Sequence, residues 1–282
     1  MRASCSLFLL LSLFAASSVS ALVPSSFRNA TIDDIDDITT VIIDAFKPSP
    51  VFKYIRQFAD KAGEEYTWTC QRDSYLALFQ HHTLDYRFQV ITVPSSTSNS
   101  GEKVVSVSVW DFSRTQDHDD NDSSRASPPL SSLLALSLSQ TVQGSVGHRP
   151  DSVFDCSAHL DMNLTRAVHF QQFMEDVERK YLTEPLGAQL YLGLLATHPE
   201  WDGNGFAAQH LRWGKAQLEL MRHPPGGRLP MTLLATPAGY PLYISEGFKG
   251  LKNATMTRLD GKGLFWHEAM KYEHVSGKSD EL

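Results

Sequence analysis

The sequence predicts a single α+β domain, in which helices flank a β-sheet. Some segments carry apolar residues at helical spacing, which predicts helices. In other segments apolar residues alternate with polar ones or form continuous runs, which predicts strands. The two kinds of segment occur in turn along the chain. Hydrophobic residues make up 42% of the 282 residues, which suits a full core and excludes a disordered or fibrous chain. The formal net charge is −7, so the chain lacks the basic footprint of nucleic-acid-binding proteins, and we expect no nucleic-acid partner.

The first residues have the pattern of a secretory signal. Arg2 gives a short positive start, residues 7–16 form an apolar run, and Val19-Ser20-Ala21 carries the small residues that signal peptidase accepts. We expect residues 1–21 to be a signal peptide and the mature chain to lack a membrane anchor, because the run is shorter than the about 20 residues that span a bilayer. The alternative is a buried first helix or a misassigned start, which would make the protein cytoplasmic.

Two further patterns agree with a secretory route. Glycosylation sequons begin at Asn29, Asn121, Asn163 and Asn253. The chain ends in Ser279-Asp-Glu-Leu282, which resembles the address that returns proteins to the endoplasmic reticulum, although Ser stands where Lys or His is usual. We predict a glycosylated protein of the secretory pathway, retained in the lumen of the endoplasmic reticulum; a solvated acidic tail is the alternative.

Cysteine usage leaves two possibilities open. Of the three cysteines, Cys5 lies within the expected signal peptide. In an oxidising lumen the other two, Cys70 and Cys156, would form a disulfide. Two buried thiols fit the sequence equally well.

The first part of the domain reads as a strand, three helices and two strands. Thr31 to Asp34 has the form of a capping box and begins a helix that ends at Phe46. Valines alternate with serines in the second long strand, which predicts one buried face. The expected ranges are strand 27–30, helices 31–46, 51–60 and 68–82, and strands 88–93 and 103–112.

The second part follows an insertion over residues 113–150, which is rich in Ser and Asp. Its acidic cluster at 117–122 lacks the Gly and the final Glu of a calcium loop, so we expect a solvated segment. A helix near 164–182 comes next, with Leu164, Val168, Val177 and Tyr181 expected on its buried face. The remaining expected ranges are strand 189–197, helix 207–221, strand 231–236, helix 240–246 and strands from 248 and over 263–272.

The turn after residue 197 has the pattern of an anion site. An apolar strand leads into a turn with Gly203 and Gly205, and a helix begins directly afterwards. Glycines let the backbone approach a ligand closely, and the free amides of a first helical turn bind anions. The phosphate-loop pattern G-x-x-x-x-G-K-[ST] and the dinucleotide pattern G-x-G-x-x-G are absent, so nucleoside triphosphate and nicotinamide chemistry are not supported.

This segment, residues 195–207, resembles the coenzyme A motif Q/R-x-x-G-x-G/A of the GNAT acetyltransferases, which follows an apolar strand and a His-Pro. Downstream, residues 233–248 match the family's second landmark, a strand followed by L-Y-x-x-x-G-F. The layout is similar to puromycin-acetyltransferase-like fungal and bacterial members. The resemblance implies one GNAT domain over 22–275, followed by a tail at 276–282. Its fold would be three-layered, α/β/α, with a mixed, strongly bent sheet of six or seven strands that splay apart.

The resemblance also implies acetyl-CoA as co-substrate and assigns its contacts. The pantetheine arm would pair with one exposed strand backbone, and the diphosphate would sit on the amides of the glycine turn. Asp202 stands where the family carries Gln or Arg, and its carboxylate would repel a diphosphate unless it turns away or caps the helix. The implied cofactor-binding residues are Leu195, Ala196, Thr197, Asp202, Gly203, Asn204, Gly205, Phe206 and Ala207.

Tyr243 matches the family's general acid. When an amine attacks the thioester, the leaving thiolate must gain a proton, and a phenol can donate it. A packing aromatic is the alternative for this residue. Glu184, Asp161 and His267 are candidates for the base that takes the amine's proton, and spacing selects none of them.

The predicted function is therefore acetyl transfer from acetyl-CoA to a primary amine of a small molecule or peptide, by direct attack on the thioester. The alternative is a degenerate GNAT fold that binds coenzyme A or a protein partner without catalysis. The acidic run 33–37 would attract a cationic amine, or would simply be the first turn of a helix. The histidines include no metal-ligand spacing, so no metal is expected.

Overall fold

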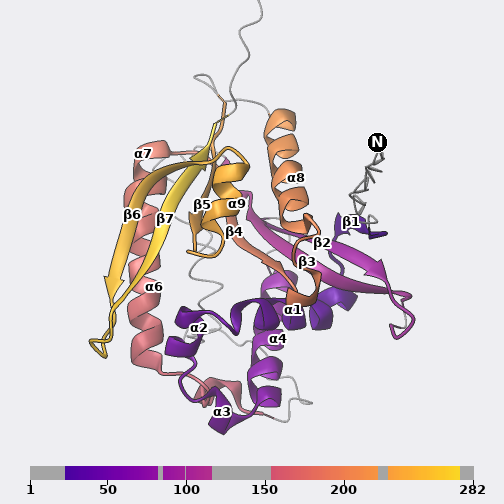
Figure 1. Cartoon of the computed structure of the whole chain (residues 1–282), viewed down its shortest axis with the longest axis vertical. Helices are drawn as coiled ribbons and strands as arrows, with labels where there is room; N and C mark the ends of the chain where they lie inside the picture. Colours follow the sequence, from indigo (N-terminus) through magenta and orange to yellow (C-terminus); the bar gives the residue numbers. More distant parts are fainter. Residues whose placement is uncertain (1–22, 82–84, 99, 116–153, 222–227, 274–282) are drawn as a thin grey trace, which may run out of the picture.

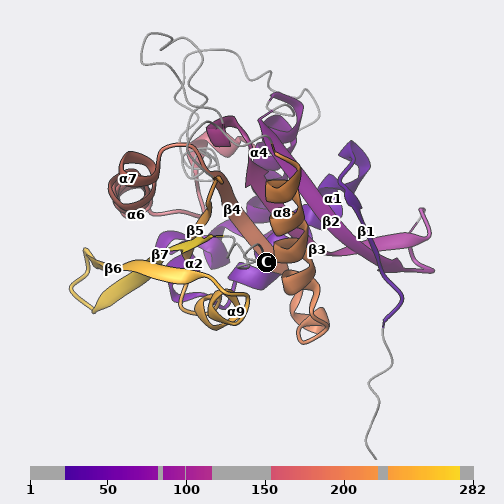
Figure 2. The ribbon, with the colours of Figure 1, turned by 90° about the horizontal axis from the view of Figure 1, so that it is seen from above.

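The computed structural model describes residues 23–81, 85–98, 100–115, 154–221 and 228–273. They form one seven-stranded mixed sheet, and helices cover both of its faces (Figures 1 and 2). The predicted α+β class, with a mixed sheet between helices, is confirmed. The expected signal peptide, most of the Ser-rich insertion and the C-terminal tail lie outside the described residues. Within the described ranges, no helix combines the length and the apolar character that crossing a membrane requires.

The strands and helices follow the predicted order with shifted boundaries. The predicted helix 51–60 divides into two short helices, with Arg56 at the C-terminus of the first. The strands are β1 Ser26–Asn29, β2 Tyr86–Pro94, β3 Glu102–Asp111, β4 Leu190–Thr197, β5 Met231–Ala235, β6 Lys249–Thr257 and β7 Leu264–Tyr272. The helices are α1 Ile35–Phe46, α2 Pro50–Ile55, α3 Ala59–Ala62, α4 Glu64–His81, α6 Leu164–Glu178, α7 Glu184–Leu186, α8 Phe206–Leu220 and α9 Tyr240–Ser245. Shorter helical turns are η1 Ile32–Asp34, η2 Ser113–Thr115, η3 Cys156–Ala158, η4 Arg179–Thr183 and η5 Pro199–Trp201.

The sheet order is β1-β2-β3-β4-β5-β7-β6, and one neighbouring pair is parallel. That pair is β4 with β5, joined over Leu190–Leu192 and Met231–Leu233. The other neighbouring pairs are antiparallel. The crossover between the two parallel strands passes through α8, as a parallel connection requires.

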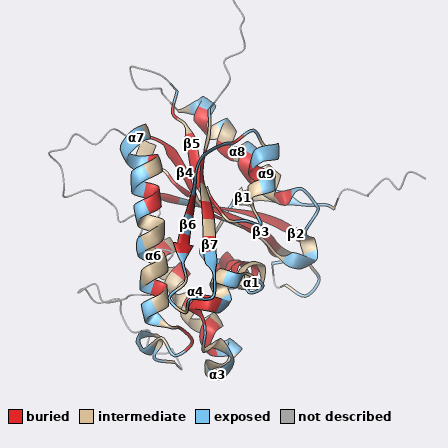
Figure 3. Ribbon diagram, turned by 60° about the vertical axis from the view of Figure 1, so that its left-hand side comes forward, coloured by how far each residue is buried: buried red, intermediate tan, exposed pale blue. Residues whose placement is uncertain are grey.

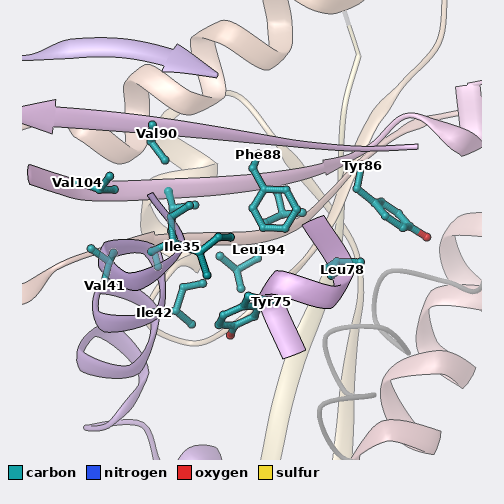
Figure 4. Close-up of a cluster of buried hydrophobic side chains, with 14 residues drawn as sticks. Ile35, Val41, Ile42, Tyr75, Leu78, Tyr86, Phe88, Val90, Val104 and Leu194 are labelled. Carbon is teal, nitrogen blue, oxygen red and sulfur yellow. The ribbon is translucent and has the colours of Figure 1, made fainter. Parts of the chain in front are cut away.

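One face of the sheet is covered by α1 and α4. Ile35, Ile38 and Ile42 of α1 pack against valines of β2 and β3, as their helical spacing predicts (Figure 4). The capping box at the start of this helix is present. The Asp34 carboxylate accepts hydrogen bonds from the Thr31 backbone N–H at 2.7 Å and from Thr31 Oγ1 at 3.0 Å.

The expectation of one buried face on the second long strand was wrong. Every residue of β3 from Val104 to Asp111 is buried, because α1 covers one face of this strand and α8 the other (Figure 3). Ser106 and Ser108 are fully buried and hydrogen-bonded to His210 of α8. Serine is tolerated there because its hydroxyl has a partner.

The expected buried face of α6 was wrong at its first two residues and is confirmed at Val177. Leu164 and Val168 are 43% and 42% exposed, whereas Ala167 and Val177 are buried. The aromatic side chain of Phe170 packs in the cluster that contains Ala167, and that of Phe173 packs in this cluster and in the one that contains Val177. Large aromatic rings gain more from burial than Leu164 or Val168, so they set which side of the helix faces inward.

A disulfide joins α4 to the segment that precedes α6. Cys70 and Cys156 are bonded, with their Cα atoms 5.3 Å apart, which decides between the two possibilities that the sequence left open. Beside it, the buried carboxylate of Asp161 forms an ion pair with Arg56 and accepts a hydrogen bond from Thr67 Oγ1 at 2.9 Å. The disulfide and the ion pair together fasten the segment before α6 to α4 and to the C-terminus of α2.

Candidate functional site

The two parallel strands separate towards their carboxyl ends. They pair only as far as Leu192 and Leu233; beyond this point β4 stays with β3 and β5 stays with β7. A bulge at Gly193 marks the point of departure, since Val109 faces Leu194 while Trp110 faces Leu192. Within the described ranges, the backbone of residues 194–197 therefore has no strand on its β5 side. An extended ligand can pair with the backbone on this side, and the predicted splaying of the sheet is confirmed.

The open strand edge leads directly into the glycine turn. Gly203 and Gly205 have φ angles of 81° and 74°, a left-handed conformation that glycine adopts without strain. Helix α8 begins at Phe206, and its first backbone bond runs from Gln209 N–H to Gly205 O at 3.1 Å. None of the backbone N–H groups of residues 203–208 donates a hydrogen bond to any part of the chain that the structure describes. A Cβ at Gly203 or Gly205 would meet nothing within 4 Å, so the space beside both glycines is open. This is the geometry of an anion site at a helix N-terminus.

A buried polar network ties α8 to the end of β4. Ser106 Oγ lies 2.9 Å from both the Ala196 carbonyl oxygen and Thr197 Oγ1, and 3.1 Å from His210 Nε2. On the other side of the ring, His210 Nδ1 lies 2.7 Å from Ser108 Oγ. The network fixes the first turn of α8 relative to the open strand edge. This network was not predicted from the sequence. The serines that alternate with valines in β3 were the residues that could have indicated it.

The entrance to the turn is held by His198. Its Nδ1 accepts a hydrogen bond from the Glu200 N–H at 3.3 Å, and its Nε2 lies 3.2 Å from Asp44 Oδ2 of α1. Asp202 is exposed and does not cap α8, since the N-cap residue is Gly205. On the motif Q/R-x-x-G-x-G/A, Asp202 takes the Gln or Arg position, followed by Gly205 and Ala207, and Glu200 lies two residues before it. Both positions are acidic and exposed, so two carboxylates flank the turn.

Tyr243 lies on α9, in the same hydrophobic cluster as Leu195 of β4. Its side chain is 8% exposed, and its ring packs edge-on against Phe248 with centroids 5.6 Å apart. Burial raises the pKa of the phenol well above its ordinary value, so the hydroxyl keeps its proton at neutral pH. The hydroxyl makes no hydrogen bond within the described residues and is not among their enclosed unpaired polar atoms. It is therefore free to bond to a ligand.

Helix α9 is anchored to α8 through Lys215. Its Nζ donates hydrogen bonds to the backbone oxygen and to a carboxylate oxygen of Glu246, both at 2.7 Å. Gly247 is the C′ residue of α9: it has a φ of 84°, and the Phe248 N–H donates a hydrogen bond to the Tyr243 carbonyl at 3.0 Å. These contacts hold the helix that carries Tyr243 against the helix that offers the free amides.

The structure brings none of the three candidate bases to Tyr243. Glu184 is exposed and paired with Arg179 at 2.7 Å, and Asp161 is enclosed in its ion pair with Arg56. His267 of β7 packs against Phe170 of α6 at 5.5 Å between ring centroids.

The next residue of β7, Trp266, instead contacts Tyr240 of α9 at 6.0 Å. Successive side chains of a strand point to opposite faces, so His267 points away from the face that carries α9. The proton acceptor therefore stays unassigned.

The acidic run 33–37 serves the fold. Asp34 pairs with Arg28 at 2.7 Å, Asp36 pairs with Arg72 on α4, and the Asp37 carboxylate accepts the Val104 N–H at 2.9 Å. Three of the four carboxylates in this run therefore have partners within the fold, and Asp33 is exposed. No group of three His, Cys, Asp or Glu side chains suited to a metal ion occurs within the described part of the chain.

Because two histidines are buried, we expect the folded protein to lose stability in acid. Burial lowers the pKa of His210 to about 3 and that of His267 to about 4, against an ordinary value of about 6.5. Below about pH 6.5 these two histidines bind protons in the unfolded chain but not in the folded chain. The free energy of unfolding therefore falls as pH falls towards these values. Each histidine contributes up to about 1.4 kcal/mol per pH unit.

The expected result is a shallower pH dependence for the His267→Phe variant, whose new ring would lie beside Phe170 and Phe173. Urea unfolding between about pH 6.5 and pH 4.5 measures the slope for each protein. Equal slopes for the variant and the unmodified chain would contradict the assignment of a neutral buried His267.

Comparison with known proteins gives structural matches only. No protein-family model matches the chain, and no curated protein does. Among solved structures, the chain is similar to a histone acetyltransferase HPA2 and related acetyltransferase from Corynebacterium glutamicum, with 18% identity, a TM-score of 0.44 and coverage of 88% of this chain and 94% of that one.

It is also similar to yncA, a putative acetyltransferase from Salmonella typhimurium with acetyl-CoA (12% identity, TM-score 0.44, coverage 91% and 98%). A third similar structure is NAA60 from Arabidopsis thaliana in complex with acetyl-CoA (9% identity, TM-score 0.43, coverage 88% and 98%). These similarities are similarities of backbone fold, and they do not assign an activity to this chain.

Proposed function

We propose that this chain is an acetyl-CoA-dependent N-acetyltransferase of the GNAT superfamily, which acetylates a primary amine of a small molecule or peptide. One observation carries the proposal: an unpaired strand edge runs into a turn with free amides, and a protonated tyrosine lies in the cluster beside that edge. The puromycin-acetyltransferase-like branch stays a prediction within it.

Each part of the site has a role in this reaction. The backbone of residues 194–197 would pair with the amides of the pantetheine arm, and the N–H groups of residues 203–207 would hold the diphosphate. The acceptor nitrogen attacks the thioester carbonyl carbon, and the carbon–sulfur bond breaks with its electron pair going to sulfur. Tyr243, which is protonated at neutral pH, would give its hydroxyl proton to that sulfur. The attacking nitrogen loses one proton to water, and water returns a proton to the Tyr243 phenolate.

A second candidate is a fold that binds coenzyme A or a protein partner without catalysis. Two observations favour it: the acidic pair Glu200 and Asp202 beside the proposed diphosphate site, and the placement of Asp161 and Glu184 in ion pairs with Arg56 and Arg179. A carboxylate near a diphosphate raises the free energy of binding, although exposure to water and salt weakens that repulsion.

Thiol release separates the two candidates. The full mature chain is incubated with acetyl-CoA and a panel of polyamines, aminoglycosides, amino acids and lysine peptides, and free thiol is measured over time. The expected result is amine-dependent release with at least one class. Thermal protection by coenzyme A without any amine-dependent thiol would contradict the enzyme proposal and support the binding protein.

The glycine turn gives a matched pair of variants. We expect Gly205→Val to raise the KM for acetyl-CoA at least about tenfold, because losing one charge-assisted backbone hydrogen bond costs about 1.5–3 kcal/mol. Gly261→Val is the control, since Gly261 has a similar φ of 68° and equally open surroundings in the β6–β7 turn. Both variants share the strain of a left-handed residue, about 1–2 kcal/mol. Equal KM values for the two would contradict a diphosphate site at this turn.

We also propose that the protein resides in the lumen of the secretory pathway. The signal-like N-terminus and the Ser-Asp-Glu-Leu end motivate this, and the disulfide between Cys70 and Cys156 supports it because disulfides persist in oxidising compartments. The mass of the N-terminal peptide of the native protein tests it. A mature chain that begins near Leu22 is expected, and an intact Met1 would contradict the proposal.

A further inference from the structure

We infer that Asn253 carries an N-linked glycan and that Asn163, in spite of its sequon, does not. This inference goes beyond acetyl transfer and rests on the proposed luminal location. The structure describes three of the four sequon asparagines, Asn29, Asn163 and Asn253. Their side chains differ in how far the fold already uses them.

Asn253 is exposed and unused by the fold. It lies on β6, the outermost strand of the sheet, and both Asn253 and the sequon residue Thr255 are exposed (Figure 3). The alternate residues Ala254 and Met256 point inward and are 8% and 3% exposed. The Asn253 side chain makes no hydrogen bond within the described residues, so a glycan there would displace no contact.

Asn163 is in the opposite situation. It is the N-cap residue of α6, and its Oδ1 accepts the Arg166 N–H at 3.2 Å. Its Nδ2, the atom that would carry the sugar, donates to Gln57 Oε1 at 3.0 Å in an exposed hydrogen bond. A glycan on that nitrogen would have to enter the contact with Gln57 and disturb the cap, and losing a cap costs about 1 kcal/mol.

Asn29 lies between these two cases. It is exposed at the end of β1, but its Oδ1 accepts a hydrogen bond from Gln89 Nε2 at 2.7 Å, which holds the side chain against β2. Asn253 is therefore the described sequon whose modification the folded protein accommodates with the fewest changes.

The modification is a group transfer from a lipid-diphosphate-linked oligosaccharide, the donor present in that compartment. A bond forms between Nδ2 of Asn253 and the anomeric carbon of the sugar, and Nδ2 loses one proton. The bond from that carbon to the diphosphate oxygen breaks, and the lipid diphosphate leaves with the electron pair.

A glycan at this position would also cover an unpaired strand edge. In the described sheet β6 pairs with β7 alone, so its outer N–H and C=O groups are free to recruit another strand. Lys249 and Lys252 are exposed on the same strand, and a bulge interrupts its register between Gly250 and Lys252. Charge and bulges discourage edge-to-edge pairing, and a bulky polar glycan serves the same purpose.

The test uses the chain in a eukaryotic secretory host, with Asn29→Gln and Asn121→Gln introduced so that only two sequons remain. A foreign leader of known function precedes residue 22, so that delivery does not depend on the chain's own N-terminus. The expected result is one glycan, removed by peptide N-glycosidase and mapped by mass spectrometry to the peptide that contains Asn253.

Two further variants complete the design. Thr255→Ala removes the sequon while keeping Asn253, and it should abolish the enzyme-sensitive mass shift; Asn163→Gln should leave that shift unchanged. A secreted chain without a glycan at Asn253, or with its glycan at Asn163, overturns the inference. The same chain with its own leader tests the location separately, so failure of the luminal proposal is distinguishable from failure of the site.

Discussion

Replacing Tyr243 with Phe is expected to lower kcat by about 10²–10⁴-fold, the usual contribution of a general acid, and to leave the KM for acetyl-CoA nearly unchanged. The substitution removes the hydroxyl and keeps the ring, so the edge-on packing against Phe248 survives. Since the hydroxyl has no hydrogen-bond partner among the described residues, stability should change little. Initial rates of thiol release and thermal unfolding measure the two effects.

Tyr240→Phe is the matched control for that experiment. Tyr240 lies one turn earlier on α9, and its ring packs against Trp266 of β7 with centroids 6.0 Å apart. Its variant should keep a nearly unmodified kcat. A Tyr243→Phe variant with unchanged kcat would show that this residue is a packing aromatic, the alternative that the sequence allowed.

Removing Arg56 is expected to have the largest effect on stability. Asp161 is 1% exposed, and in an Arg56→Met variant its carboxylate would lose its charged partner while staying buried. Breaking a buried ion pair by removing one partner costs about 3–5 kcal/mol. Urea unfolding should show this as a lower midpoint with an unchanged slope.

The double variant Arg56→Met/Asp161→Leu tests the cause. Replacing both charges by apolar groups of similar size leaves no unpaired charge, so most of the lost stability should return. Lys47→Met is the surface control, because the Lys47–Glu64 pair is exposed and such pairs contribute little. A double variant as unstable as Arg56→Met would contradict the argument from the unpaired carboxylate.

The sequence predicted features that depend on neighbouring residues. The glycine turn, the start of α8 and the position of Tyr243 depend on short patterns, and all three lie where those patterns placed them. The capping box at Thr31 was predictable for the same reason, since it needs only two residues three positions apart.

Features that depend on distant parts of the chain were missed or misassigned. The alternation of Ser106 and Ser108 with valines resembles a half-exposed strand, and only the presence of His210 on α8 explains why both serines are buried. The separation of β4 from β5 was expected only from the family resemblance, because it follows from register, which no local pattern specifies. The base could not be selected because its identity depends on which side chains the tertiary fold brings to the thioester.

The disulfide would keep the protein covalently linked after one proteolytic cleavage between its two cysteines. Cys70 and Cys156 are 86 residues apart, and the bond closes all the chain between them, the Ser-rich residues 116–150 included, into a covalent ring. A single proteolytic nick anywhere in that ring would yield two fragments that stay joined. Without reductant such a nicked protein would migrate as one band. After reduction it would separate into two bands, so two bands on a reducing gel would report processing rather than degradation.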